Sequence, residues 1–197
     1  MANGLYQTEG IILNSLDQGE ADKVITVYTR EFGMLRLFAR GTRRSSSKLN
    51  KFLNIYSYGR FGFVSGKDSW HLIDAEDIRH FDSVLGNRER LESFGRVARF
   101  IERFHHGEMK DPEIFGLIEN AIHYLRDIPG EILPEFELVF LSKALAIFGY
   151  LDEEAFDAKL LDLVSDNSFE DKIMILDDAE KAVLEGAVSE AIARSQL

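Results

Sequence analysis

The sequence predicts an α+β protein, in which a small five-stranded barrel at the N-terminus is followed by a mainly α-helical domain. In the first 80 residues, short runs rich in Ile, Val, Thr and Tyr alternate with turn residues, as is typical of β-strands. From Leu85 onward, apolar residues recur at helical spacing instead. The change of period places the predicted domains at residues 1–80 and 81–197.

Five strands account for the first domain. Their expected ranges are Gly10–Leu16, Asp22–Arg30, Met34–Arg40, Leu53–Val64 and Ser69–Asp77. The segments Gly19–Asp22 and Glu31–Gly33 between them have the length of hairpin turns. Because a closed sheet has no unpaired edge strands, this many short strands in so short a segment favours a barrel.

Four helices are expected in the second domain. The first covers Asn87–His106, the second begins at Asp111, the third covers about Leu133–Phe148 and the fourth covers Asp177–Gln196. The second begins with Asp-Pro-Glu, which offers a capping side chain, a proline at the first position and an acid near the positive end of the dipole. Gly149 suits the end of the third helix. The acidic segment from Leu151 to Leu176 shows no clear period.

Composition excludes several classes of protein. A hydrophobic fraction of 45% and 15 Phe among 197 residues provide for a folded core. The chain has no Cys, which excludes disulfides and thiolate zinc sites and suits a reducing compartment. No apolar run is long enough for a transmembrane helix, and the N-terminus lacks the features of a signal peptide. We therefore expect a cytoplasmic protein without membrane contact.

The two domains differ sharply in charge. The whole chain has a formal net charge of -11. Residues 1–80 hold 11 Lys and Arg against 9 Asp and Glu, which gives +2, whereas residues 81–197 hold 12 against 25, which gives -13. The first domain can therefore meet a polyanion, and the second would repel one at short range.

The positive charge is concentrated in the segment Arg36–Lys51. It contains no acid and six cationic residues, namely Arg36, Arg40, Arg43, Arg44, Lys48 and Lys51. Its polar centre, Gly-Thr-Arg-Arg-Ser-Ser-Ser, predicts a flexible loop. Such a loop can bind phosphates, although phosphate contacts carry no information about base sequence.

The alternation of side chains along the strands places aromatic rings on the same faces as some of the arginines. In the third strand Arg36, Phe38 and Arg40 share one face. In the fourth strand Tyr56, Tyr58 and Arg60 share one face, which we expect to point outward. Arginines that neutralise phosphates, next to rings that stack on unpaired bases, are typical of single-strand binding. Two alternatives stay open: the loop is merely solvated, or the two tyrosines pack beneath the helical domain.

Three motifs resemble a known family. Thr8–Leu13, Gly19–Gly33 and Ala39–Leu49 are similar, in this order and spacing, to the N-terminal barrel of the RecO family of bacterial DNA repair and recombination mediators. Phe136–Glu153 resembles the helix that precedes the C-terminal lobe in that family. The resemblance implies an OB-fold followed by a helical domain.

The resemblance also implies a function. Members of this family bind single- and double-stranded DNA, anneal complementary strands and, together with RecR, help to load the recombinase onto DNA coated with single-strand binding protein; they are not enzymes. By this resemblance, the basic barrel surface of the family corresponds here to residues within or beside the matching motifs, namely Lys23, Arg36, Arg40, Arg43, Arg44, Lys48 and Arg60. Lys51 corresponds to it more loosely. Association with the nucleoid would follow.

The sequence departs from the family in two ways. Many members carry a four-cysteine zinc site in the helical domain, whereas this chain has no Cys, so we expect a zinc-free protein without a cofactor and with a short C-terminal lobe. The family's helical domain also receives the acidic, apolar tail of single-strand binding protein. The expected cationic residues for that tail are Arg96, Arg99 and Arg103, on one helix face. The alternative is a solvated face paired with acids such as Glu102.

Two rival functions are considered. The first is a non-enzymatic adaptor whose acidic helical domain binds a basic partner. The second is a metal-assisted nuclease, which the sequence disfavours: His105, His106 and Glu108 are close in sequence, but adjacent residues on a helix point in different directions. Trp70, the single Trp, is expected in the core or at a domain interface.

Overall fold

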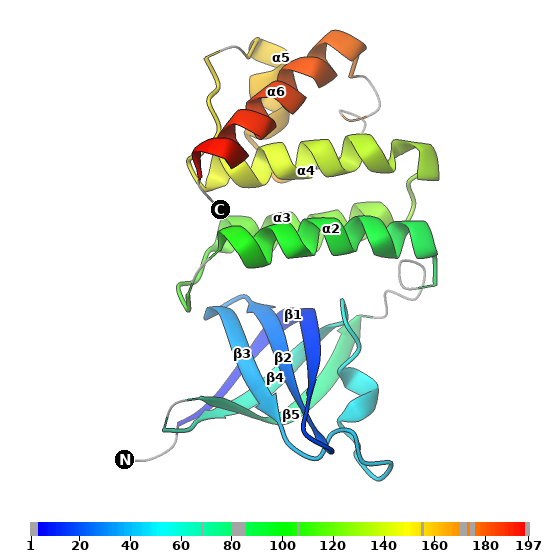
Figure 1. The fold of residues 1–197 in the computed structure, drawn as a ribbon, viewed down its shortest axis with the longest axis vertical. Coiled ribbons are helices and arrows are strands. Elements are labelled where there is room, and N and C mark those ends of the chain that lie inside the picture. Colours follow the sequence, from blue (N-terminus) through cyan, green and yellow to red (C-terminus); the bar gives the residue numbers. More distant parts are fainter. Residues whose placement is uncertain are drawn as a thin grey trace. The chain divides into compact units, whose positions relative to one another are not determined.

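The computed structural model describes residues 4–67, 69–79, 86–105, 107–154, 156–169, 173 and 176–195. The chain forms two compact units, which are Met1–Asp82 with His105–Asp111 and Ser83–Phe104 with Pro112–Leu197. The first unit is a closed five-stranded barrel and the second consists of helices (Figure 1). The predicted fold class is therefore confirmed.

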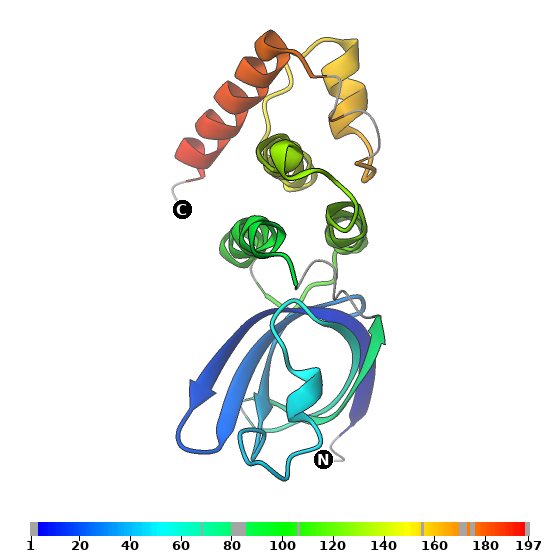
Figure 2. The ribbon, with the colours of Figure 1, turned by 90° about the vertical axis from the view of Figure 1, so that its right-hand side faces the viewer.

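The barrel consists of β1 (Leu5–Gln18), β2 (Asp22–Thr29), β3 (Gly33–Ala39), β4 (Tyr58–Ser65) and β5 (Trp70–Arg79). The strands follow one another around it in the order β1-β2-β3-β5-β4, and β4 pairs with β1 to close the circle (Figure 2). The pairing of β3 with β5 is parallel and the other pairings are antiparallel. This arrangement is that of the OB-fold.

Strand β1 is longer than predicted and serves two neighbours. Its first half pairs with β4 and its second half with β2, and the register shifts between Ile12 and Asn14. A bulge of this kind bends a strand and increases its twist, which lets one strand follow the curve of the barrel. The predicted strand begins only at Gly10, because the polar residues Gln7–Glu9 do not give the first half of β1 the sequence pattern of a strand.

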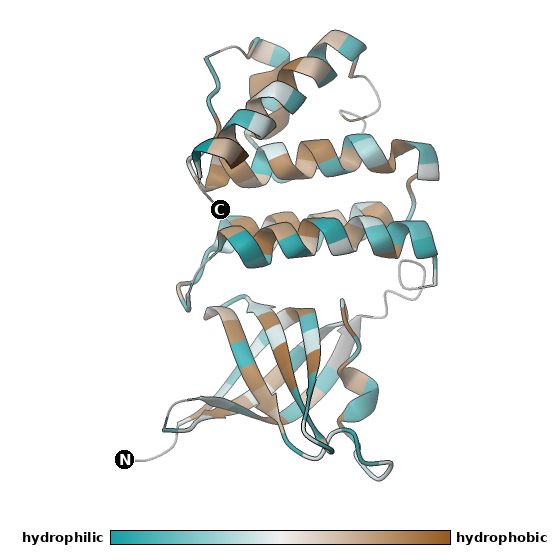
Figure 3. Cartoon of the chain, in the orientation of Figure 1, coloured by the Kyte–Doolittle hydropathy of each residue, from teal (hydrophilic) through white to brown (hydrophobic). Residues whose placement is uncertain are grey.

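Side chains alternate between a dry interior and the outside. The interior holds residues that are almost completely buried, including Ile12, Ile25, Val27, Leu35, Leu37, Ala39, Phe61 and Phe63. Figure 3 shows the corresponding hydrophobic and hydrophilic bands along β3. This alternation with period two fixes which residues of each strand face solvent.

The segment Leu53–Ser57, predicted as the start of the fourth strand, is not a strand. A 3-10 turn at Asn50–Phe52 precedes it, and the amide of Ser57 donates to the carbonyl of Asn54 at 3.1 Å in a tight turn. Within that turn Tyr56 has a left-handed backbone with φ 67°. Leu53 is buried in the barrel core, so tertiary packing overrides the strand propensity of this segment.

The connector His105–Asp111 folds with the barrel, although the predicted domain border assigned it to the second domain. The hydroxyl of Tyr28 lies 3.2 Å from Nδ1 of His105, and the indole of Trp70 donates to Glu108 at 2.8 Å. Burial, together with the charge of Asp111, raises the pKa of Tyr28, so its hydroxyl stays protonated. The helix predicted to reach His106 ends at Phe104, and His106 lies outside the described residues.

The second unit is built around one central helix. Its helices are α2 (Arg88–Phe104), α3 (Pro112–Leu125), α4 (Leu133–Ile147), α5 (Ala158–Val164) and α6 (Asp178–Arg194). Helix α4 contacts each of the others, and Figure 2 shows α2, α3 and α4 nearly end-on. The four predicted helices are present, and the short α5 was not predicted.

Local bonds close two helix ends, of which the one at Gly149 was predicted. Helix α4 ends in a Schellman motif, in which Gly149 has φ 72° and the amide of Tyr150 donates to the carbonyl of Leu145 at 2.9 Å. Helix α6 begins with a capping box formed by Asp177 and Glu180. These local bonds satisfy backbone groups that the helices leave open.

A buried lysine joins α4 to the end of α5. Lys143 is completely buried, and its ammonium group donates to the carbonyls of Leu163 and Asp166 and to the Asp166 carboxylate at 3.3 Å. A cation at the C-terminal end of a helix meets the negative end of its dipole. Lys143 thus ties α4 to Leu163 and Asp166, which lie in the segment that shows no sequence period.

Substitution of Gly33 tests the packing of the connector against the barrel. Gly33 has φ 65°, and an added Cβ atom would overlap the backbone of Met109. We expect Gly33→Ala to lower the free energy of unfolding by more than about 2 kcal/mol, because the clash adds to the cost of a left-handed alanine. Chemical denaturation measures this.

Gly19→Ala provides the control. Gly19 has φ 58° and nothing within 4 Å of the added atom, so only the backbone cost of about 1–2 kcal/mol applies. Equal losses for the two variants would contradict the close contact between Gly33 and the connector.

Candidate nucleic-acid interface

The outer face of β3 carries the expected alternation. Arg36 is exposed and Phe38 half-buried on this face, while the intervening Leu35, Leu37 and Ala39 are buried in the core. Arg40 follows the strand and is exposed. The expectation that Arg36, Phe38 and Arg40 share the solvent side is therefore confirmed.

The basic loop is folded rather than flexible at its base. The amide of Gly41 donates to the Asp22 carboxylate at 2.7 Å, and the buried hydroxyl of Thr42 donates to the carbonyl of Ala39 at 3.0 Å. Consecutive turns follow, with the amide of Ser47 donating to the carbonyl of Arg44 at 2.9 Å. The loop is thus held against the turn between β1 and β2.

The cations on β3 and in the basic loop differ in whether an acid neutralises them. Four of them are exposed and form no ion pair with any residue in the described ranges: Arg36, Arg40, Arg44 and Lys48. Arg43, in contrast, pairs with Asp17 at 3.2 Å and donates to the carbonyl of Gly19 at 2.8 Å. The loop arginines therefore have different roles: Arg43 anchors the loop and Arg44 projects from it.

The two remaining lysines are peripheral. Lys51 lies over the ring of its neighbour Phe52 at 4.5 Å. Lys23 is half-buried and in register with Ala39, a residue of the barrel core, so its position does not belong to the outer row of β3.

The predicted stacking role of the two tyrosines is wrong in its geometry. Tyr56 is only 9% exposed and lies in the turn before β4, and Tyr58 is completely buried. Neither ring is available to a ligand. The expectation failed because the sequence places both residues in one strand, whereas the strand begins at Tyr58.

Arg60 is neutralised by neighbouring carboxylates. It lies 2.6 Å from Glu76 and 3.7 Å from Glu9. The hydroxyl of Tyr58 donates to Glu9 at 2.6 Å, and Arg30 lies 3.4 Å from the same carboxylate. The Tyr58 hydrogen bond and the charges of Arg30 and Arg60 hold the pKa of Glu9 below its usual value. Although Glu9, Arg30 and Arg60 line a cavity of about 410 Å³, these charges and that of Glu76 balance one another.

The three arginines predicted for a protein partner do not act alike. Arg96 makes a bidentate pair with Glu137 of α4, with both bonds at 2.6 Å, and this pairing raises the pKa of its guanidinium. Arg99 and Arg103 are exposed and form no ion pair with any residue that the structure describes. For Arg96, the alternative of an arginine paired with an acid is therefore the correct one, with Glu137 rather than Glu102 as its partner.

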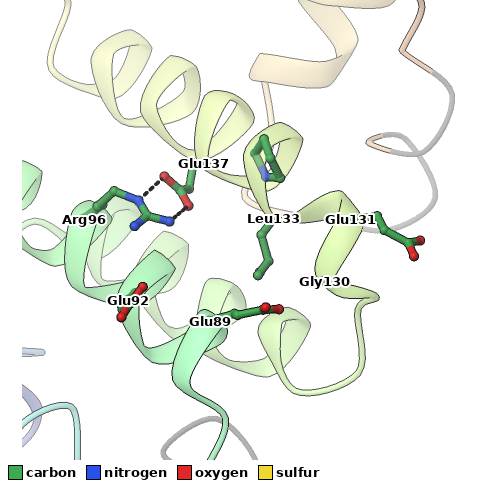
Figure 4. Close-up of a pocket in the computed structure, with 8 residues that line it drawn as sticks. Glu89, Glu92, Arg96, Gly130, Glu131, Leu133 and Glu137 are labelled. Atoms are coloured by element: carbon green, nitrogen blue, oxygen red, sulfur yellow. Dashed lines mark hydrogen bonds and ion pairs between the residues drawn. The ribbon is translucent and has the colours of Figure 1, made fainter.

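An acidic cavity surrounds the Arg96–Glu137 pair. Its volume is about 580 Å³, and its lining includes Glu89, Glu92 and Glu131, with Leu133 as an apolar wall (Figure 4). Glu92 pairs with Arg88 at 2.7 Å. The cavity therefore carries excess negative charge.

An apolar patch accompanies Arg99 and Arg103 in the same unit. Phe100 stacks on Phe104 with ring centroids 4.2 Å apart, and Phe104 meets Phe148 and Tyr150 at 6.3 and 5.9 Å. Tyr150 is 43% exposed. The patch covers a buried cluster of Phe104, Leu145, Val188 and Ala191, and its further members are partly buried, namely Leu138, Leu141, Leu151 and Ile192.

The described ranges contain neither a metal-binding cluster nor a membrane-spanning helix. No cluster of three or more His, Asp or Glu side chains there could hold a metal ion. None of the helices described is long and apolar enough to cross a membrane.

The ion cluster at Glu9 predicts a pH dependence. Because the folded state lowers the pKa of Glu9, the stabilisation is present above the ordinary pKa of 4.5 and is lost as the pH falls through the lower folded value. We expect Glu9→Gln to reduce the loss of thermal stability between pH 7 and pH values near 3. Thermal unfolding followed by circular dichroism measures it, and an unchanged acid sensitivity would contradict the ion cluster.

Comparison with known proteins agrees with the barrel. Residues 1–81 match the family model described as "Recombination protein O N terminal". The protein named DNA repair protein RecO in Halalkalibacterium halodurans is 30% identical over 122 residues, which cover 62% of this chain and 48% of that protein.

Other relatives match beyond the barrel. The DNA repair protein RecO of Thermodesulfovibrio yellowstonii is 30% identical over 150 residues, covering 75% of this chain and 59% of the relative. That of Bacillus cytotoxicus is 24% identical over 190 residues, covering 94% of this chain and 75% of the relative. The chain thus spans about half to three quarters of these relatives. With its OB barrel, its helical unit and these matches, the chain belongs to the RecO family.

Proposed function

We propose that this protein is a DNA-binding recombination mediator in DNA repair, which binds and anneals single-stranded DNA and assists recombinase loading with RecR. Double-stranded DNA would bind more weakly to the same surface. The relatives' name, DNA repair protein RecO, supports the role in repair. No bond is broken in this function, and the protein would act in the cytoplasm, on the nucleoid.

The observation that carries the proposal is the set of exposed cations on and beside β3. In a chain of net charge -11, carboxylates neutralise Arg43, Arg60 and Arg96. Arg36, Arg40, Arg44 and Lys48 keep their charge available, and a polyanion gains most at such positions. We place the DNA interface there and leave Tyr56, Tyr58 and Arg60 out of it.

The mechanism follows from charge neutralisation. Two complementary strands repel each other through their phosphates, and a cationic surface that binds one strand lowers this repulsion toward the other. Phosphate contacts position a strand without reading its sequence, as annealing of any sequence requires. Base pairing itself supplies the driving force for the product.

The apolar patch and its two arginines suit a second partner. A short acidic and apolar peptide, such as the tail of single-strand binding protein, would bury its apolar side chains against Phe100 and Phe148 and direct its carboxylates to Arg99 and Arg103. These arginines are exposed and neighbour Phe100 and Phe104 on α2.

The acidic cavity favours one alternative function. An adaptor that binds a basic partner would use Glu89 and Glu131 (Figure 4). This function predicts capture of a basic partner that survives nuclease treatment and is lost in a Glu89→Gln, Glu131→Gln variant, while DNA binding stays weak in every variant.

The DNA interface predicts a specific change in salt dependence. In fluorescence anisotropy with a labelled single strand, Arg36→Gln with Arg44→Gln should weaken binding about tenfold. The slope of log K against log salt should fall by about 1.4, because each lost phosphate contact contributes about 0.7. Arg88→Gln with Arg126→Gln, on the helical unit, changes the net charge equally and should have little effect. Equal effects of the two pairs would reject this interface.

The second partner surface is tested with a synthetic peptide that carries the acidic, apolar tail of a single-strand binding protein. We expect Arg99→Glu with Arg103→Glu to weaken peptide binding at least tenfold in anisotropy, because attraction becomes repulsion. Arg88→Glu with Arg126→Glu is the charge-matched control. Peptide binding that is insensitive to both pairs would contradict the assignment.

A further inference from the structure

A transverse row of three apolar side chains and one histidine crosses the outside of the barrel. Leu16 of β1 is in register with Val24 of β2, Val24 with Phe38 of β3, and Phe38 with His71 of β5. None of these side chains belongs to the barrel core, to which their strand neighbours Ile25, Leu37 and Leu72 contribute. The row therefore spans neighbouring strands at the solvent side.

The row is accessible, and its ring is held in place. Leu16 is 62% exposed, and Val24 and Phe38 are half-buried. The Phe38 ring meets the His71 ring edge-on, with centroids 5.9 Å apart and planes at 62°. His71 in turn lies 3.2 Å from the hydroxyl of Ser69 through Nε2. One edge of the Phe38 ring is thus fixed, as a stacking platform requires.

Unpaired cations lie on both sides of this ring. Arg36 and Arg40 are two residues before and after Phe38 along the chain, roughly 7 Å away at the rise of a β-strand. Both are exposed and form no ion pair with a described residue. A ring between two cations matches a strand whose phosphates meet the cations while an unpaired base meets the ring. A duplex keeps its bases stacked inside, so that only its phosphates can meet this surface and bind the cations.

We propose that Phe38 stacks on an unpaired base and gives the barrel its preference for single-stranded over double-stranded DNA, with Leu16 and Val24 as apolar support beside it. This inference rests on the proposed DNA-binding function and adds the residue that distinguishes the two forms of the ligand. The cations bind both forms of DNA, whereas the ring strengthens binding of the single strand only.

The test compares Phe38→Leu with the wild-type protein by anisotropy, using a labelled single strand and its duplex at two salt concentrations. Loss of one stacked base should weaken single-strand binding about 5- to 150-fold. The duplex affinity and both salt slopes should stay unchanged, because the cations remain. Phe52→Leu is the matched control: that ring is also partly buried but packs against the core, so its loss should leave the preference intact.

A second readout detects the stacking itself. In Phe38→Trp, binding of the single strand should quench tryptophan fluorescence beyond the change seen in the wild-type protein, which contains only Trp70. Binding of the duplex should produce no such additional quenching. Circular dichroism and the thermal unfolding midpoint establish that each variant is folded.

The outcomes separate the two proposals. If wild-type protein binds neither form of DNA, both the proposed function and this inference are wrong. If it binds DNA but Phe38→Leu weakens both forms equally or neither, or the introduced Trp is not quenched, only the role of Phe38 is wrong. A selective loss of single-strand binding together with quenching supports the inference.

Discussion

The parallel pairing of β3 with β5 is the constraint on which the candidate interface depends. It joins Leu37 to Trp70 and Phe38 to His71 and thereby places β5 next to β3 in the closed barrel. Strand β3 thus has a neighbouring strand on each side, and one of its faces is committed to the core. The opposite face is then fixed as a solvent surface, on which Arg36 and Phe38 stand at defined positions beside β2 and β5.

Charge pairing decides which cations of this acidic protein remain available. Asp17 neutralises Arg43, Glu76 and Glu9 neutralise Arg60, and Glu137 neutralises Arg96. Exposed pairs of this kind contribute little stability, but they remove the positive potential of their arginines. The loop beyond β3 is anchored through one paired arginine and presents the next one, Arg44, to solvent. A local cationic surface can therefore coexist with a net charge of -11.

Features with a short sequence period could be predicted, and features that depend on distant partners could not. Alternation in β3 placed Arg36 and Phe38 correctly, and helix periodicity and end signals located the long helices. Tyr58, by contrast, bonds to Glu9, which is 49 residues away. Tyr28 and His105 meet across 77 residues, and no local pattern reveals that the connector folds with the barrel. The left-handed turn at Tyr56 also contradicts the strand propensity of its segment.

Arginine footprinting tests the central claim most directly, namely that the solvent face of β3 with its following loop is where DNA binds. Modification by phenylglyoxal, with and without a single-stranded oligonucleotide, is quantified for each arginine by mass spectrometry. The account predicts protection of Arg36, Arg40 and Arg44, and unchanged reactivity of Arg88 and Arg126. Protection confined to arginines of the helical unit, with Arg36 and Arg44 still reactive, would contradict it.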